Sequence, residues 1–98
     1  MLKFYSVNYT LHQPGLRYDK IVAAIKKVSE NRCIKPLDSF WILQSGLTMQ
    51  QIYDAIRAAV GSNDALVVAT FDVKVWIAQG LAPDHADWLL AASKLKAA

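Results

Sequence analysis

The strongest constraint on the fold is a long strand pattern that begins at residue 2 and ends at a turn. Residues 2–11 (LKFYSVNYTL) are rich in aromatic and β-branched side chains, and the turn-forming run HQPG follows them. This composition favours a strand in the centre of a sheet. Because side chains alternate along a strand, Asn8 and Thr10 are predicted to share one face, with Tyr9 on the other.

The rest of the chain alternates between helix and strand patterns. Apolar residues spaced three and four apart predict helices, whereas short apolar or alternating runs predict strands. Helices are expected over 20–31, over 48–60 and from Pro83 to Leu95, and strands over 33–35, 39–44, 65–71 and 73–77. The 65–71 run is apolar along nearly its whole length, which predicts an interior strand.

Capping and breaking residues set the expected bounds of these elements. Asp19 is a typical N-cap, so the first helix is expected to begin directly after it, with the preceding Pro-Gly pair in a loop. Thr48 and Gln51 fit a capping box at the start of the second helix, and Gly61 is expected to end that helix. Because proline has no backbone donor, Pro36 predicts an edge position for the strand that it follows.

The order of these elements predicts one ferredoxin-like α+β domain over residues 1–98. A β-α-β-β-α-β order with short connections places two helices on one face of a four-stranded antiparallel sheet. The strand over 73–77 and the helix from Pro83 are additions at the carboxyl-terminal side of this unit. The opposite face of the sheet is then open to a partner or ligand.

Composition narrows the class of protein. The chain has 98 residues, of which 54% are hydrophobic and 19% are charged, so it is globular. This apolar excess is high for a small monomer, which favours self-association through an exposed face. No apolar run reaches the roughly 20 residues needed to span a bilayer, and Cys33 is the single cysteine. We therefore expect a cytoplasmic homodimer with no membrane partner.

The basic residues are unevenly distributed along the chain. The stretch from Arg17 to Lys35 holds six basic residues against Asp19 and Glu30, a local charge of +4 within a total of +3. The basic residues are Arg17, Lys20, Lys26, Lys27, Arg32 and Lys35. One interpretation is a solvated helix face, and the other is a surface for an anionic partner such as nucleic acid.

No catalytic constellation stands out. A hydroxyl at Thr10 near the imidazole of His12 is one way to build a nucleophile with its base, but a turn role for these residues is the preferred interpretation. His85 lies far away in sequence, and a site of two histidines without a spaced carboxylate is a poor metal site. We predict no catalytic residue, no metal site and no cofactor.

Acidic and aromatic residues leave two further alternatives. Asp38 precedes one predicted strand and Asp72 follows another. The two carboxylates either form an acid pair or, in the preferred interpretation, are ordinary turn formers. The three tryptophans serve either as stacking platforms for bases or as core residues. The chain lacks a glycine-rich phosphate loop, and its third strand lacks the basic, glycine and aromatic pattern of the common RNA-binding ferredoxin-like module.

Several short motifs together resemble a known family. The strand ending VNYTLH, followed by QPG and Tyr18, is similar to the opening of small SinR-family proteins, which are related to the CRISPR-associated endoribonuclease subunit of the spacer-integration complex. The DSFWIL run, the Asn63-Asp64 turn and the closing GL…DWL run match the same group. The similarity extends from Lys3 to about Leu89. It implies a ferredoxin-like subunit that dimerises through its sheet and a late strand.

The chain departs from this group at Thr10, where the nuclease relatives carry an aspartate. In that family the aspartates of two subunits are proposed to hold a divalent metal, and the resemblance places Thr10 and Asn8 at this position. Threonine cannot supply the negative charge of an oxygen-ligand site for Mg²⁺ or Mn²⁺. The expected function is a non-catalytic nucleic-acid-binding or scaffolding homodimer. The alternatives are a protein-interaction or regulatory subunit of a defence or toxin-like system and, less favoured, a metal-dependent endonuclease.

Overall fold

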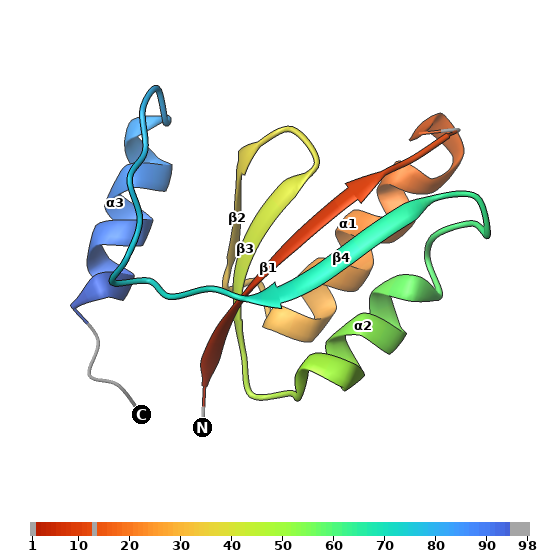
Figure 1. Cartoon of the computed structure of the whole chain (residues 1–98), viewed down its shortest axis with the longest axis horizontal. Helices are drawn as coiled ribbons and strands as arrows, with labels where there is room; N and C mark the ends of the chain where they lie inside the picture. Colours follow the sequence, from red (N-terminus) through yellow and green to blue (C-terminus); the bar gives the residue numbers. More distant parts are fainter. Residues whose placement is uncertain (1, 13, 95–98) are drawn as a thin grey trace.

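The computed structural model describes residues 2–12 and 14–94, without the side chains of residues 14–17, and shows a mixed α+β fold (Figure 1). The elements in chain order are β1 (Lys3–Thr10), α1 (Pro14–Ser29), β2 (Cys33–Leu37), β3 (Phe40–Ser45), α2 (Met49–Arg57), β4 (Ala65–Thr70) and α3 (Pro83–Ser93).

The strands form a four-stranded antiparallel sheet in the order β2-β3-β1-β4. The predicted central position of β1 is confirmed, since it pairs with β3 on one side and β4 on the other. The edge position predicted from Pro36 is also confirmed, and the pairing of β2 with β3 is irregular between Ile34 and Leu37. Proline cannot donate to the ladder, which accounts for this irregularity.

The position predicted for β4 is wrong, because this strand lies at the second edge of the sheet. Its apolar run does not reflect burial on both faces. Val67 is 62% exposed, and the burial along the strand alternates rather than being continuous. A run of apolar residues on an edge strand instead leaves apolar side chains in contact with solvent, which bears on the candidate site below.

Each face of the sheet has its own apolar cluster. Helices α1 and α2 cover the first face (Figure 1), where Ile21, Ile25, Ile52 and Ile56 pack with Tyr5, Val7, Tyr9, Trp41 and Leu43. On the second face, Leu89 of α3 packs with Ile34 of β2 and Ile42 of β3. Helix α3 therefore covers the β2 side of the second face and reaches Phe4 at the start of β1, while Asn8, Thr10 and Val67 farther along β1 and β4 stay exposed. The chain measures only 19 Å along its shortest axis, against 38 Å along its longest.

Helix α1 begins earlier than predicted. It starts at Pro14, so Asp19 lies within the helix rather than at its cap. Proline is well suited to a first helical turn, where its missing N–H has no intrahelical partner. At the other end, Glu30 and Asn31 have φ values of 52° and 67°, and the Asn31 N–H donates to the carbonyl of Lys26 at 2.9 Å. The left-handed pair ends the helix at Ser29.

The capping box predicted for α2 is confirmed. The Gln51 N–H donates to the Thr48 hydroxyl at 3.1 Å, and the Thr48 N–H donates to Oε1 of Gln51 at 2.9 Å. The helix ends at Arg57, earlier than predicted. Gly61 lies in the following turn, where its N–H donates to Oδ2 of Asp64 at 2.7 Å.

The strand predicted over 73–77 is wrong, because residues 71–82 contain turns and extended backbone without a strand. Asp72 reverses the chain: its Oδ1 accepts from the Lys74 N–H at 2.9 Å, and its carbonyl accepts from the Val75 N–H at 3.1 Å. The indole of Trp76 then donates to the carbonyl of Val73 at 2.8 Å. An Asx turn of this kind satisfies the local backbone without a neighbouring strand. The additional carboxyl-terminal helix is present as α3.

Among residues 2–12 and 14–94, the structure has no helix with the length and apolar character that crossing a membrane requires.

Candidate functional site

A row of side chains crosses all four strands on the second sheet face. Register pairs Val67 of β4 with Asn8 of β1, Asn8 with Phe40 of β3, and Phe40 with Leu37 of β2. Residues directly paired across antiparallel strands point to the same face. The two ends of this row are exposed, with Val67 at 62% and Leu37 at 58%. We call Val67, Asn8, Phe40 and Leu37 the cross-sheet row.

The predicted common face of Asn8 and Thr10 is confirmed. Thr10 pairs with Ala65 beside the cross-sheet row, and both Asn8 and Thr10 are exposed. Tyr9 is buried on the other face, under α1 and α2. His12 is exposed in the loop after β1, and its backbone N–H donates to Oδ1 of Asp64 at 2.9 Å. The end of β1 therefore presents a hydroxyl and an amide to solvent.

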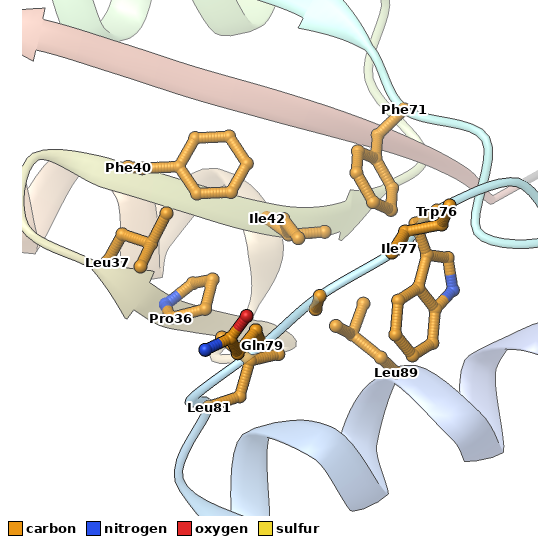
Figure 2. Close-up of a pocket in the computed structure, with 11 residues that line it drawn as sticks. Pro36, Leu37, Phe40, Ile42, Phe71, Trp76, Ile77, Gln79, Leu81 and Leu89 are labelled. Carbon is orange, nitrogen blue, oxygen red and sulfur yellow. The ribbon is translucent and has the colours of Figure 1, made fainter.

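An apolar cavity continues from the Phe40 and Leu37 end of this row (Figure 2). Its volume is about 280 Å³, and it lies between β2, β3, the 76–81 segment and α3. Trp76, Leu81 and Leu89 form its α3 side, and Phe40 and Ile42 form its floor. Ile77 at the rim is fully exposed. The sequence pattern gave no indication of this cavity, because the alternation over 73–77 predicts a strand where the cavity lining begins.

Among the side chains that the structure describes, the predicted basic residues do not form one compact patch. Lys20 and Lys27 are exposed and lie seven residues apart, nearly two turns, on the side of α1 turned away from the buried Ile21 and Ile25. Lys26 is also exposed, but it is rotated by about 100° from Lys27 around the helix. Lys20 and Lys27 therefore form the main cationic pair on the outer surface of the helix layer.

Two of the remaining basic residues, Arg32 and Lys35, each have a local partner. Arg32 forms an exposed ion pair with Glu30, at 3.0 Å between Nη2 and Oε2. Lys35, on β2, donates from its amino group to the phenol oxygen of Tyr18 on α1. The side chain of Arg17 lies outside the described part of the chain.

The Lys35 side chain lines a pocket of mixed polar and apolar character at the end of β1, which we call the β1-end pocket. The pocket has a volume of about 390 Å³ and is lined by Tyr9, Thr10, Leu11, Tyr18, Lys35, Asp38 and Ser39. The hydrogen bond to Tyr18 raises the pKa of Lys35 above its ordinary value, against a smaller opposing effect of burial, and Asp38 adds a weak attraction. The amino group is also 5.0 Å from the Tyr18 ring centroid, but its contact to the phenol oxygen is the closer interaction.

Asp38 and Asp72 do not form an acid pair. Asp38 lies in the turn between β2 and β3, near the end of β1, whereas Asp72 follows β4 next to the start of β1, where the Phe71 N–H donates to the carbonyl of Phe4. The two aspartates therefore lie at opposite ends of the sheet. Asp72 forms a turn, which agrees with the preferred interpretation of this residue. Within residues 2–12 and 14–94, no group of three histidine, cysteine or acidic side chains is arranged to hold a metal ion.

The tryptophans pack in clusters rather than forming a stacking platform. Trp41 is buried in the core below α1 and α2. Trp88 meets Phe4 edge to face, at 5.9 Å between ring centroids and 83° between ring planes. Trp76 packs against the cluster of the second face. Their positions agree with the core interpretation.

Comparison with known proteins adds no assignment: neither models of protein families nor curated protein sequences give a match to this chain.

Proposed function

We propose that the protein is a non-catalytic, homodimeric nucleic-acid-binding scaffold, joined through the open face of its sheet. One observation carries this proposal: exposed apolar side chains and exposed basic side chains lie on opposite sides of the molecule. The cross-sheet row lies on the second face of the sheet, and Lys20 and Lys27 lie on the outer side of the helix that covers the first face.

The apolar side supports self-association. Val67, Leu37 and Ile77 are large apolar residues exposed to more than half of their full extent, and Leu37 and Ile77 also line the apolar cavity. Removing such surface from water stabilises a complex by about 25 cal/mol per Å². A two-fold axis places the same surface on both partners, so one face of one chain is sufficient for a closed dimer.

The basic side supports binding of phosphate groups. A dimer joined through the second sheet face carries its two α1 helices on opposite outer surfaces, with Lys20 and Lys27 directed to solvent on each. Lysines positioned in this way neutralise backbone phosphates without reading base sequence. This arrangement favours a scaffold that holds nucleic acid over a sequence-specific reader.

We infer that the fold is a variant of the ferredoxin-like arrangement, as the family resemblance implies. The strand order β2-β3-β1-β4 with two helices on one face supports this inference. The exposed Val75 and Ile77 lie where the resemblance implies a strand shared with a partner, so these residues are proposed to be covered in the dimer.

The non-catalytic assignment rests on the donor set at the end of β1. Thr10 and Asn8 offer a hydroxyl and an amide, which are weak ligands for Mg²⁺ or Mn²⁺. A regulatory subunit that binds another protein through the same apolar face remains the alternative function, and the exposed cross-sheet row is the observation that favours it.

Light scattering combined with size-exclusion chromatography tests the dimer. The expected mass at micromolar concentration is twice that of the 10.9 kDa chain. Val67→Lys places a charge in the proposed interface and is expected to give a monomer, whereas Ala55→Lys, on the exposed side of α2, leaves the dimer intact. A wild-type monomer contradicts the proposal. A dimer that binds no nucleic acid at low salt favours the protein-binding alternative.

A further inference from the structure

The β1-end pocket is bounded by β1, by β2 with its following turn, and by α1. The Tyr9 N–H donates to the carbonyl of Ser39 at 3.2 Å, which ties the β2–β3 turn to β1. The Lys35–Tyr18 hydrogen bond ties β2 to α1. The walls of the pocket are therefore held by contacts between elements rather than by a single loop.

The donors of this pocket suit an anion. Lys35 has three N–H donors and uses one of them on Tyr18. Because the Tyr18 oxygen accepts this bond, its own proton is left to donate to another group. An ammonium and a phenol held side by side supply two donors to one anionic group, and hydrogen bonds with a charged partner are the stronger kind.

The other lining residues favour a ligand that carries more than one kind of chemical group. Asp38 is exposed at the same pocket and accepts hydrogen bonds, so it favours a ligand that also carries hydroxyl or amino donors. Leu11 and the Tyr18 ring add apolar surface for a planar ring. A nucleotide unites a phosphate, a sugar with hydroxyl donors and a flat base, and a pocket of about 390 Å³ is within the usual range for small ligands.

We propose that this pocket binds a single nucleotide, with the phosphate at Lys35 and Tyr18 and the sugar hydroxyl or base amino group at Asp38. The inference rests on the proposed function for the source of the ligand, which is a nucleotide of a bound strand. A free nucleoside monophosphate has the same chemistry, so the experiment includes both sources.

Amide NMR spectra of the full chain, titrated with uridine monophosphate, test the pocket directly. The signals of Tyr9, Lys35 and Ser39 are expected to shift, with a much weaker response to uridine, which lacks the phosphate. Lys35→Met is expected to weaken binding about tenfold or more, because a hydrogen bond to a charged group is lost. Tyr18→Phe, which keeps the ring, is expected to weaken it several-fold. Lys74→Met, an exposed lysine in the turn after β4 at the opposite end of the sheet, is the matched control and leaves this affinity unchanged.

A labelled oligouridine in the same variants separates this inference from the proposed function. If uridine monophosphate shifts these signals in a Lys35-dependent way while the strand does not bind, the pocket stands as a site for free nucleotide and the proposed function fails. If the strand binds equally well to wild type and Lys35→Met, and the monophosphate does not shift the pocket signals, the pocket inference is overturned while the proposed function stands. The ligand-free amide spectrum of Tyr18→Phe is the folding control for the pocket variants, and it is expected to keep the wild-type pattern of signals.

Discussion

The indole Nε1 of Trp41 donates a hydrogen bond to the phenol oxygen of Tyr9 at 3.1 Å inside the core. The two side chains come from β3 and β1 and are both almost fully buried below α1 and α2. Since Tyr9 also lines the β1-end pocket and precedes Thr10, this bond fixes the end of β1 from within the core.

Tyr9→Phe is expected to destabilise the protein by about 1–3 kcal/mol, because it leaves the buried Trp41 N–H without its acceptor. Tyr53→Phe on α2, which is only half-buried, is the control and is expected to have little effect. Chemical denaturation of both variants gives the free energies of unfolding. Equal stability of Tyr9→Phe and wild type contradicts the structural role assigned to this bond.

Thr48→Ala is expected to cost about 1 kcal/mol, because the α2 capping box loses the hydroxyl that accepts from the Gln51 N–H. Gln50→Ala removes only the exposed contact to Asp54 on the same helix and is expected to cost about 0.2–0.5 kcal/mol. Thermal unfolding followed by circular dichroism compares the two. An equal loss in both variants argues that the cap has no special contribution.

Leu89→Ala is expected to destabilise the attachment of α3 by about 2–5 kcal/mol, since its side chain is buried against Ile34 and Ile42. Leu90→Ala on the exposed side of the same helix is the matched control. Hydrogen exchange of the α3 amides reports the local opening of this helix. Protection that is unchanged in Leu89→Ala contradicts the packing described for the second face.

Thr10→Asp is expected to fold normally, because Thr10 is exposed on the second sheet face. The wild-type protein is expected to cleave neither RNA nor DNA with Mn²⁺, while the aspartate variant is expected to bind Mn²⁺ more tightly, as measured by calorimetry. Wild-type cleavage that survives Asp38→Ala and Asp72→Ala but disappears in Thr10→Ala shows that Thr10 belongs to an active site.

Local patterns predicted much of the first half of the fold. The alternation along residues 2–11 gave the two faces of β1, and the spacing of Thr48 and Gln51 gave the start of α2. Pro36 indicated the edge of the sheet correctly, since a missing donor is a property of the residue itself. These features depend on residues that are close together in the sequence, so the sequence pattern is sufficient to predict them.

Features that depend on distant partners were not predictable in the same way. The apolar run of β4 was interpreted as an interior strand, but apolar residues on an exposed edge give the same pattern. The 73–77 segment has strand-like alternation yet has no strand beside it within the described chain. The pairing of Lys35 with Tyr18 joins residues 17 positions apart and follows only from how α1 crosses β2.

The salt dependence of nucleic-acid binding tests whether Lys20 and Lys27 hold phosphate groups, as the proposed function requires. Fluorescence anisotropy of a labelled duplex and a labelled single strand is measured with increasing salt, for wild type and for the double variant Lys20→Gln, Lys27→Gln. The proposed function predicts binding at low salt whose affinity falls steeply as salt rises, with a logarithmic slope of roughly −0.9 for each phosphate contact on a duplex, and a shallower slope in the variant. Absence of binding to either strand form at low salt, or a slope unchanged by loss of both lysines, contradicts it.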